Sequence, residues 1–368
     1  MTKTRADFEL EDSPMFETLD EVKATLRQHF EIKDWQGVEI IMAAAVAHYL
    51  PGEMLWLRII GASRSGKTEL LRAIAEHPGF AEIEAITPAS LRGGFKKAPK
   101  LLDRINGKLV IDKDISAILT ARKDMRNEIF GLLRGVKDGK LTADFGSDEG
   151  HLSQEARFDW LLASTSYIEQ QRQLEGLLGE RFIDVRWRPG DREEMAFRAA
   201  TNNPYLENIR AQLAVDVISL MCRAEQLTKT ESYILSETDL RTIAGIADTA
   251  AIARTPIQQD RQGHLVAMPD PEVGTDLAQG FSRIAGALLL LGMTDFTPYI
   301  QRLAWDCIPS ARVKLLQRLQ AKSQTVPELA KATEIPERTV YYVIEQLELL
   351  KLVKDNGGMK ELCKHLNM

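Results

Sequence analysis

The residues best suited to chemistry stand together at positions 61–68, which read Gly-Ala-Ser-Arg-Ser-Gly-Lys-Thr. This is the G-x-x-x-x-G-K-T pattern of a phosphate-binding loop, whose glycines let backbone N–H groups turn inward around a chain of phosphates. Lys67 can reach the β- and γ-phosphates of a nucleotide, and the Thr68 hydroxyl can ligate Mg²⁺. We expect a nucleotide to contact Gly61, Ala62, Ser63, Arg64, Ser65, Gly66, Lys67, Thr68 and Glu69.

The elements around this loop suit a phosphate site. Residues 55–60 are almost all apolar and predict a buried strand, and residues 69–76 predict a helix. The loop then lies at a helix N-terminus, where anions are favoured. The alternative is a chance match in an ordinary Gly/Ser turn, and the strand before and helix after argue against it.

A second acidic element follows in residues 108–114, Lys-Leu-Val-Ile-Asp-Lys-Asp. An apolar strand that ends in an acid, here Asp112, is the arrangement that holds the magnesium shell of bound ATP, although any buried strand can end in Asp. Successive side chains of a strand point to opposite faces, so Asp112 and Asp114 share a face. Asp114 is therefore our candidate for the base that orients the attacking water. Slow hydrolysis, or none, is the alternative.

Composition limits the remaining classes. The chain has 368 residues, enough for two or three domains, and a net charge of −6, which argues against a general nucleic-acid coat. No apolar run approaches the roughly 18 residues of a membrane span, so we expect no membrane partner. The three cysteines are widely spaced and odd in number. We therefore expect neither a disulfide framework nor a zinc site, and a cytoplasmic location.

Pattern changes along the chain predict four regions. Residues 1–34 form a polar, partly helical extension. In residues 35–190 strands alternate with helices, which predicts an α/β domain with a mostly parallel sheet. Residues 191–310 are helical, apart from an exposed connection at 255–274. Residues 311–368 carry ten Lys/Arg and seven Asp/Glu, a local charge of +3 that favours a DNA-facing module.

The order of motifs resembles the AAA+ ATPases, particularly the branch with a hairpin before sensor 1, which includes the MCM helicases and the MoxR-type ATPases. The residues LLRGVKDGKLT (132–142) look like its passage from helix to hairpin, LLASTS (161–166) like its sensor 1 strand, and LLGERF (177–182) like the segment with the arginine finger. The resemblance implies a three-layer P-loop core with a parallel sheet, followed by a helical lid.

It also implies roles for two further residues. Ser166 falls at the sensor 1 position, where those families usually carry Asn, and its alternative is a satisfied hydroxyl at a strand end. Arg181 falls at the arginine finger, which stabilises the charge of phosphoryl transfer from a neighbouring subunit. A homo-oligomer, expected to be a hexameric ring, follows from that role. The alternative is a solvated surface arginine. Neither Arg283 nor Arg241 matches sensor 2 well.

In such a ring the hairpin around residues 137–140 would point into the pore, where Lys137 and Lys140 would meet DNA phosphates. The alternative is that both lysines are simply solvated. Residues 312–356 read as three helices and resemble a winged helix-turn-helix domain, with Arg338, Thr339 and Tyr342 on the face that would enter the major groove. Docking of a protein is the alternative for this face. Residues 359–366 look helical, unlike a wing strand.

Two main functions are compatible with these residues. The first is a ring-forming ATPase that translocates along, unwinds or remodels DNA, as an MCM-like helicase does. The second is a nucleotide-switched DNA-binding loader or regulator that hydrolyses slowly, which Lys113 at the usual Glu position favours. A chaperone-like remodeller of a protein partner is a third alternative.

Overall fold

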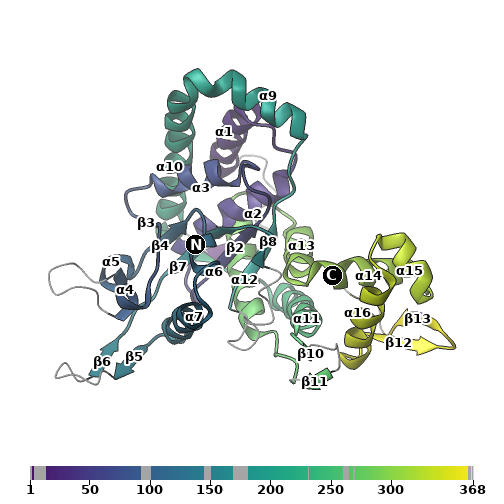
Figure 1. Ribbon diagram of the computed structural model, residues 1–368. Coiled ribbons are helices and arrows are strands. Elements are labelled where there is room, and N and C mark those ends of the chain that lie inside the picture. The colour runs from purple at the N-terminus through teal and green to yellow at the C-terminus, as the bar shows by residue number, and fades with distance from the viewer. Residues whose placement is uncertain are drawn as a thin grey trace.

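A five-stranded parallel sheet forms the centre of the computed structural model, which describes residues 2–3, 14–92, 101–144, 151–168, 181–230, 232–259, 265–267, 270–363, 366 and 368 (Figure 1). Its strands are β2 (Trp56–Ile60), β3 (Ala81–Ile83), β4 (Leu109–Asp112), β7 (Asp159–Ser164) and β8 (Ile183–Arg186). They lie in the order β3-β4-β7-β2-β8, and each neighbouring pair is parallel. The expected α/β architecture with a parallel sheet is confirmed.

All five strands run the same way, so the sheet has a carboxyl edge, where the strands end, and an amino edge, where they begin. Strand β7 lies between β4 and β2, with Ser164 opposite Ile60 and Leu162 opposite Asp112. Two strand spacings, about 10 Å, therefore separate the end of β4 from β2. The residues that follow β7 lie beside the residues that follow β2.

Alternating side chains give the sheet two apolar faces, as strands buried on both sides require. Leu57 and Ile59 belong to one buried cluster, and Trp56 and Ile60 to another. The helices with residues in the first cluster are α1 (Pro14–His29), α2 (Trp35–Val46), α3 (Lys67–Ala75), α10 (Leu206–Thr230), α11 (Glu237–Arg254), α12 (Thr275–Leu290) and α13 (Thr297–Cys307). The second cluster contains residues of α4 (Pro88–Arg92), α5 (Leu101–Ile105), α6 (Ser116–Leu119) and α7 (Lys123–Lys137).

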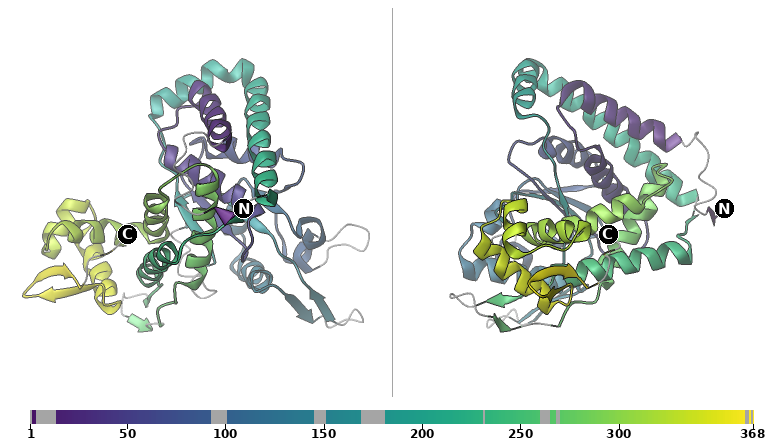
Figure 2. Two further views of the ribbon diagram at one scale, coloured as in Figure 1. Left: turned by 180° about the vertical axis from the view of Figure 1, so that it is seen from behind. Right: turned by 90° about the vertical axis from the view of Figure 1, so that its right-hand side faces the viewer.

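A helical projection rises beyond the carboxyl edge of the sheet (Figures 1 and 2). It consists of α1, α9 (Arg192–Asn202) and the upper part of α10, with a short 3₁₀ segment at Asn203–Tyr205 (η3) joining α9 to α10. A second 3₁₀ segment, Ala47–Tyr49 (η2), follows α2. Buried ion pairs tie the later helices to the sheet region: Arg302 of α13 binds Asp34, which is the N-cap of α2. The proposed limit between a core at 35–190 and a lid at 191–310 stays a prediction, although both regions contribute to one core.

The turn at Asp138-Gly139 ends a helix and is not the tip of a hairpin. Gly139 has φ of +89° and its N–H donates to Val136 O, while Lys140 N donates to Gly135 O, which closes the last turn of α7. The hairpin comes directly afterwards, as β5 (Leu141–Asp144) and β6 (His151–Gln154), with residues 145–150 outside the described parts. The expected passage from helix to hairpin is therefore present, but the hairpin lies a few residues later than predicted.

The C-terminal module contains α14 (Ser310–Ala321), α15 (Val326–Thr333), α16 (Glu337–Leu349), β12 (Val353–Asn356) and β13 (Met359–Leu362). Thr325 caps α15 as predicted and forms a capping box with Glu328. The prediction of a helix at 359–366 was wrong for Met359–Leu362, which form strand β13, and residues 364 and 365 lie outside the described parts. Gly357 and Gly358 have φ of +63° and +88°, which suits a two-residue hairpin turn, and β13 pairs antiparallel with β12.

This module packs directly against the helical part of the body (Figure 2). Arg312 is buried and donates to Ala253 O and Thr255 O at the end of α11, both at 2.8 Å, and to Gln346 of α16. The remaining strands form two short ladders: β1 (Thr2–Lys3) with β9 (Ser232–Tyr233), and β10 (Gln258–Gln259) with β11 (Leu265–Ala267). Among the helices of the described residues, none has the length and apolar character needed to cross a bilayer.

Candidate functional site

The predicted phosphate loop joins β2 to α3 at the carboxyl edge of the sheet. Gly61 N donates to Ser164 O at 3.1 Å, which fixes the loop's first residue beside β7. A Cβ on Gly61 would lie 2.9 Å from Cβ of Trp187, and Gly66 has φ of +91°. Both positions therefore require glycine, one for lack of space and the other for its backbone conformation.

Trp187, which follows β8, holds the loop from the side. Its Nε1 donates to Ser65 O at 2.7 Å, and its own N–H donates to Ile60 O at 2.8 Å. The side chain is buried. Sequence reasoning missed this residue, although its place after a strand next to β2 is a usable signal, because carboxyl ends of parallel strands meet at one edge.

Lys67 lies at the centre of the loop and is only 4% exposed. Its ammonium donates to Gly61 O at 3.1 Å and Ala62 O at 2.9 Å, so it lies folded over its own loop. Burial lowers the pKa of Lys67, and the negative charge of Asp114 counteracts this effect. The buried Ser65 hydroxyl has no hydrogen-bond partner among the described residues. A buried cation and an unsatisfied hydroxyl in one loop are groups that a phosphate would satisfy.

Asp112 ends β4 and is buried. Burial raises the pKa of Asp112 to about 6, the N–H of Asp114 lowers it by donating to Oδ1 at 3.0 Å, and the charges of Asp114 and Glu82 raise it further. A buried carboxylate surrounded by other acids suits a divalent cation. The described residues contain no cluster of three or more His, Cys, Asp or Glu side chains that could hold a metal alone.

Strand β4 ends at Asp112, so the extended backbone assumed for residues 113 and 114 is absent, and the N–H of Asp114 bonds back to Asp112 Oδ1. Lys113 forms an ion pair with Glu82 of β3. Asp114 is exposed, its charge acts on the pKa of Lys67, and its Oδ1 accepts hydrogen bonds from the N–H (2.9 Å) and hydroxyl of Ser116. Asp114 is thus an acid whose charge acts on the loop lysine, and Ser116 bonds to its carboxylate.

Two further predicted residues lie near the loop with different surroundings. Ser166 is exposed just beyond the end of β7. Glu69 is in the first turn of α3, where its carboxylate accepts two bonds of 2.8 Å from Arg210 of α10. The side chain of Glu69 therefore joins α3 to the helical projection, and only its backbone belongs to the loop.

A cavity of about 330 Å³ opens beside the loop. This volume lies in the range of roughly 300–1,000 Å³ for small-molecule pockets. Its walls come from the end of α1, from the loop and from α9, and include Phe30, Gly66, Thr68, Met195 and Ala199. The sequence patterns did not predict that α9 would line this cavity.

Hydrogen bonds to the end of α1 hold α9 over this cavity. Asn202 donates to His29 O at 2.6 Å, and Arg198 donates to Arg27 O at 2.8 Å and Phe30 O at 3.2 Å. These bonds satisfy carbonyls that a helix C-terminus leaves without intrahelical partners.

Arg181 lies at the opposite, amino edge of the sheet, two residues before β8 begins. Its guanidinium donates to Asp276 at 2.9 Å and forms an ion pair with Asp138 at 3.2 Å. The five residues of β2 span about 16 Å between the two edges, so Arg181 does not reach its own loop. The preceding residues of the predicted motif, 175–180, lie outside the described parts.

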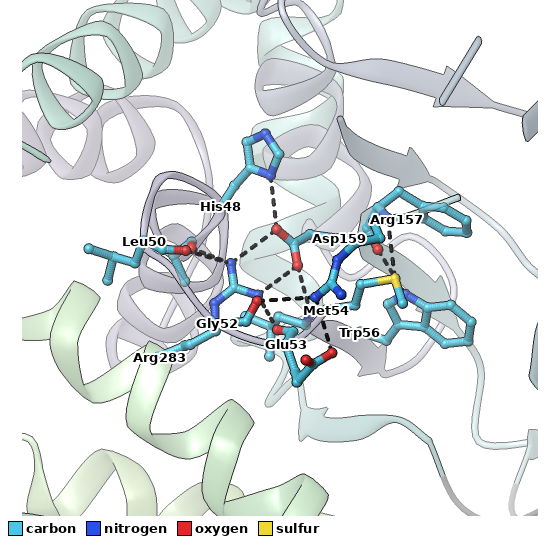
Figure 3. Close-up of polar contacts among 12 residues, drawn as sticks. His48, Leu50, Gly52, Glu53, Met54, Trp56, Arg157, Asp159 and Arg283 are labelled. Atoms are coloured by element: carbon cyan, nitrogen blue, oxygen red, sulfur yellow. Dashed lines mark hydrogen bonds and ion pairs between the residues drawn. The ribbon is translucent and has the colours of Figure 1, made fainter. Parts of the chain in front are cut away.

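The two sensor 2 candidates do not face the loop. Arg283 lies at the amino edge, where it binds both carboxylate oxygens of Asp159 at 2.8 and 3.1 Å (Figure 3). Asp159 also accepts from Leu55 N and from His48. Arg241 is an exposed residue of α11 paired with Glu237.

The two predicted pore lysines differ in their surroundings. The ammonium of Lys137 donates to Met54 O and lies 5.6 Å from the ring centre of Trp56, and burial lowers the pKa of Lys137 to about 8. Lys140 is exposed at the start of the hairpin. Of the two, Lys140 is the one presented to solvent.

The outer face of α16 carries the residues predicted to contact DNA. Arg338 and Thr339 are exposed, and Arg338 donates to the hydroxyl of Tyr342 at 3.2 Å while its guanidinium lies over that ring. Tyr341 beside them is 64% exposed. The face therefore presents one guanidinium and two tyrosine rings.

No protein-family model matches this chain, and no curated protein sequence matches it.

Proposed function

We propose that this chain is a ring-forming AAA+ ATPase that couples ATP hydrolysis to translocation, unwinding or remodelling of DNA. The observation that carries the proposal is the loop at the carboxyl edge, with its buried Lys67 ammonium and unsatisfied Ser65 hydroxyl next to the acid pair. In this proposal the loop N–H groups and Lys67 hold the phosphates, and the neighbouring cavity holds the nucleoside.

Mg²⁺ would bind between Thr68 and Asp112 and would neutralise charge on the phosphate oxygens. Asp114 would accept the proton of the attacking water, because its backbone bonds to Asp112 and its charge acts on Lys67. Ser116 would keep the carboxylate of Asp114 turned toward that water through its two hydrogen bonds.

The position of Arg181 supports a shared site. Its guanidinium is 31% exposed at the edge of the sheet that its own nucleotide does not reach. A partner in head-to-tail contact would bring this edge against the loop, and repetition of such a contact closes a ring. The catalytic role of Arg181 would then be to stabilise the charge that develops on the partner's nucleotide.

Contact with DNA rests on two exposed regions. Lys140 begins the hairpin β5–β6, which projects from the amino-edge side of the sheet, and Arg338 leads the outer face of α16 (Figure 1). Lysine and arginine neutralise phosphates without reading sequence, so this contact would weaken steeply with salt.

A nucleotide-switched loader or regulator is the second candidate, and Lys113 favours it. This residue occupies the position after Asp112 and is turned away toward Glu82, so it places no acid beside the water. If Asp114 does not replace the acid that usually follows the position of Asp112, the chain would bind ATP, assemble and hydrolyse ATP slowly.

Steady-state ATPase activity of the purified chain, with and without single-stranded and duplex DNA, tests both candidates. Strong stimulation by DNA supports the motor, and slow turnover that DNA does not change supports the switch. No nucleotide binding by wild-type protein in calorimetry would refute both.

A DNA titration tests the two contact regions. We expect Lys140→Ala and Arg338→Ala each to weaken DNA binding and to lower the slope of log affinity against log salt by about 1. Arg241→Ala is the matched control, because Arg241 is equally exposed but lies on α11. Equal effects of all three substitutions would contradict the assignment.

A further inference from the structure

We propose that Asp276 and Asp138 are positioning residues that hold the Arg181 guanidinium ready for the neighbouring subunit's nucleotide. This inference rests on the function proposed above and adds residues to the same shared site. Asp276 is in the first turn of α12, and Asp138 is the C-cap of α7, so the two acids come from different elements on either side of the arginine.

The contacts engage separate nitrogens of the guanidinium. Nη1 of Arg181 donates to Asp276 Oδ2 at 2.9 Å, and Nη2 lies 3.2 Å from Asp138 Oδ1. A guanidinium carries five N–H donors, so these two contacts leave others for a phosphate. An arginine side chain has several rotatable bonds. Contacts with two acids on fixed elements already restrict these bonds, so the side chain loses less conformational entropy when its guanidinium binds a phosphate.

The surrounding charges explain why the acids are needed. Arg181, Lys137, Arg254 and Asp276 all line one small cavity at the amino edge. Three cations at one place repel one another, and the negative charge of Asp276 also raises the pKa of Lys137. Without the acids, this repulsion would move the exposed Arg181 away from its present position.

Asp276 has the stronger contact of the two. Its distance to Arg181 is shorter, and its side chain is 41% exposed against 54% for Asp138. Asp276 is also fixed in the first turn of α12. We therefore expect loss of Asp276 to have the larger effect.

The first test compares turnover and nucleotide affinity. We expect Asp276→Asn to lower kcat about ten-fold and Asp138→Asn about three-fold, while the Kd for nucleotide stays within about two-fold, because neither acid touches the chain's own loop. Asp276→Glu should recover most of the activity. Asp270→Asn, an exposed acid on the nearby connection, is the matched control and should leave kcat unchanged.

Mixed assemblies separate positioning from a general loss of structure. A Lys67→Ala subunit is expected to lack hydrolysis but to keep the arginine and both acids. When it is mixed in equal amounts with Asp276→Asn subunits, turnover per Asp276→Asn subunit should rise about five-fold, because half of the intact loops then face an intact arginine.

Three outcomes would overturn the inference while leaving the proposed function in place: unchanged kcat in Asp276→Asn when Arg181→Ala is inactive, a higher kcat in Asp276→Asn, or no rise on mixing. A higher kcat would mean that the acids restrain the arginine instead of presenting it. Full activity of Arg181→Ala would remove both the shared site and this inference.

Discussion

The two edges of the central sheet carry buried acids whose pKa values are shifted in opposite directions. At the amino edge, Asp159 is satisfied by Leu55 N, His48 and Arg283 (Figure 3). Burial alone would raise its pKa, but the bonds from His48 and Arg283 hold the pKa of Asp159 below its usual value. At the carboxyl edge, Asp112 is equally buried, yet its pKa is raised to about 6.

The difference separates a structural role from a proposed functional one. A buried acid with enough donors stabilises the folded chain, whereas a buried acid without them costs stability until a cation arrives. The buried Ser65 hydroxyl of the loop also lacks a hydrogen-bond partner among the described residues. A buried acid with a raised pKa at one edge, against one with a lowered pKa at the other, marks the edge that we propose binds nucleotide.

The largest expected effect is at the amino edge. Asp159→Ala leaves the buried guanidinium of Arg283 without its acid, and breaking such a pair typically costs about 3–5 kcal/mol. We expect the free energy of unfolding in urea to fall by that amount. Arg241→Ala, which breaks an exposed pair with Glu237, is the control and should cost below about 1 kcal/mol. Similar losses for both would contradict the structural role of Asp159.

At the carboxyl edge, Lys67→Ala should affect activity far more than folding. Loss of a charged donor to the phosphates should lower turnover by about 10²–10³-fold, or roughly 3–4 kcal/mol in transition-state stabilisation. Steady-state ATPase assays measure this effect. Lys113→Ala, which removes the neighbouring lysine paired with Glu82, is the matched control. Wild-type turnover in Lys67→Ala would disprove the loop assignment.

Asp112→Asn should stabilise the nucleotide-free chain while it removes Mg²⁺-dependent turnover. A folded pKa of about 6, above the usual 3.8, means that this group favours folding below pH 3.8 and loses that contribution as pH rises through 6. Near pH 7.5 the buried charge costs on the order of 2–3 kcal/mol, which the amide should recover. Urea unfolding near pH 7.5 and pH 4.5 should show the gain shrinking in acid.

Asp248→Asn, at an exposed position of α11, provides the control for that experiment. Stability of Asp112→Asn below wild type near pH 7.5 would mean that this carboxylate has more hydrogen-bonding support than the structure shows.

The smallest effect is expected for a substitution of Trp187, which contacts the loop from the side. Trp187→Phe keeps an aromatic ring but removes the donor to Ser65 O, a bond worth about 1 kcal/mol. We expect nucleotide affinity in calorimetry to fall about five-fold, with Trp305→Phe as the control on α13. A loss as large as that of Lys67→Ala would show that the indole does more than support the loop.

Local patterns explain what the sequence could predict. The loop, β2, α3, β4 and α7 are each specified by a few consecutive residues, as are the capped helices of the C-terminal module. Asp138-Gly139 and Gly357-Gly358 show the limit of this reasoning. Each pair marks a turn, but only the neighbouring hydrogen bonds decide whether it ends a helix or closes a hairpin.

The missed features depend on contacts between distant residues. Trp187 and Ser65 are separated by 122 positions, and Asn202 and His29 by 173. Such pairs leave no periodic signal, because each side chain is placed by the packing of whole elements. The hydrogen bonds of Asp159 were missed for the same reason, since its donors come from α12 and from the segment between α2 and β2.

The indole of Trp187 also gives the chain a built-in optical probe. Its emission depends on the polarity and hydrogen bonding around the ring, and the ring lies beside Ser65 and Gly66 in the loop. Trp56 and Trp160 lie together toward the opposite end of the sheet, with ring centres 5.4 Å apart, and supply a background that events at the loop leave unchanged. Loop occupancy can therefore be followed by fluorescence in real time, without attaching a dye.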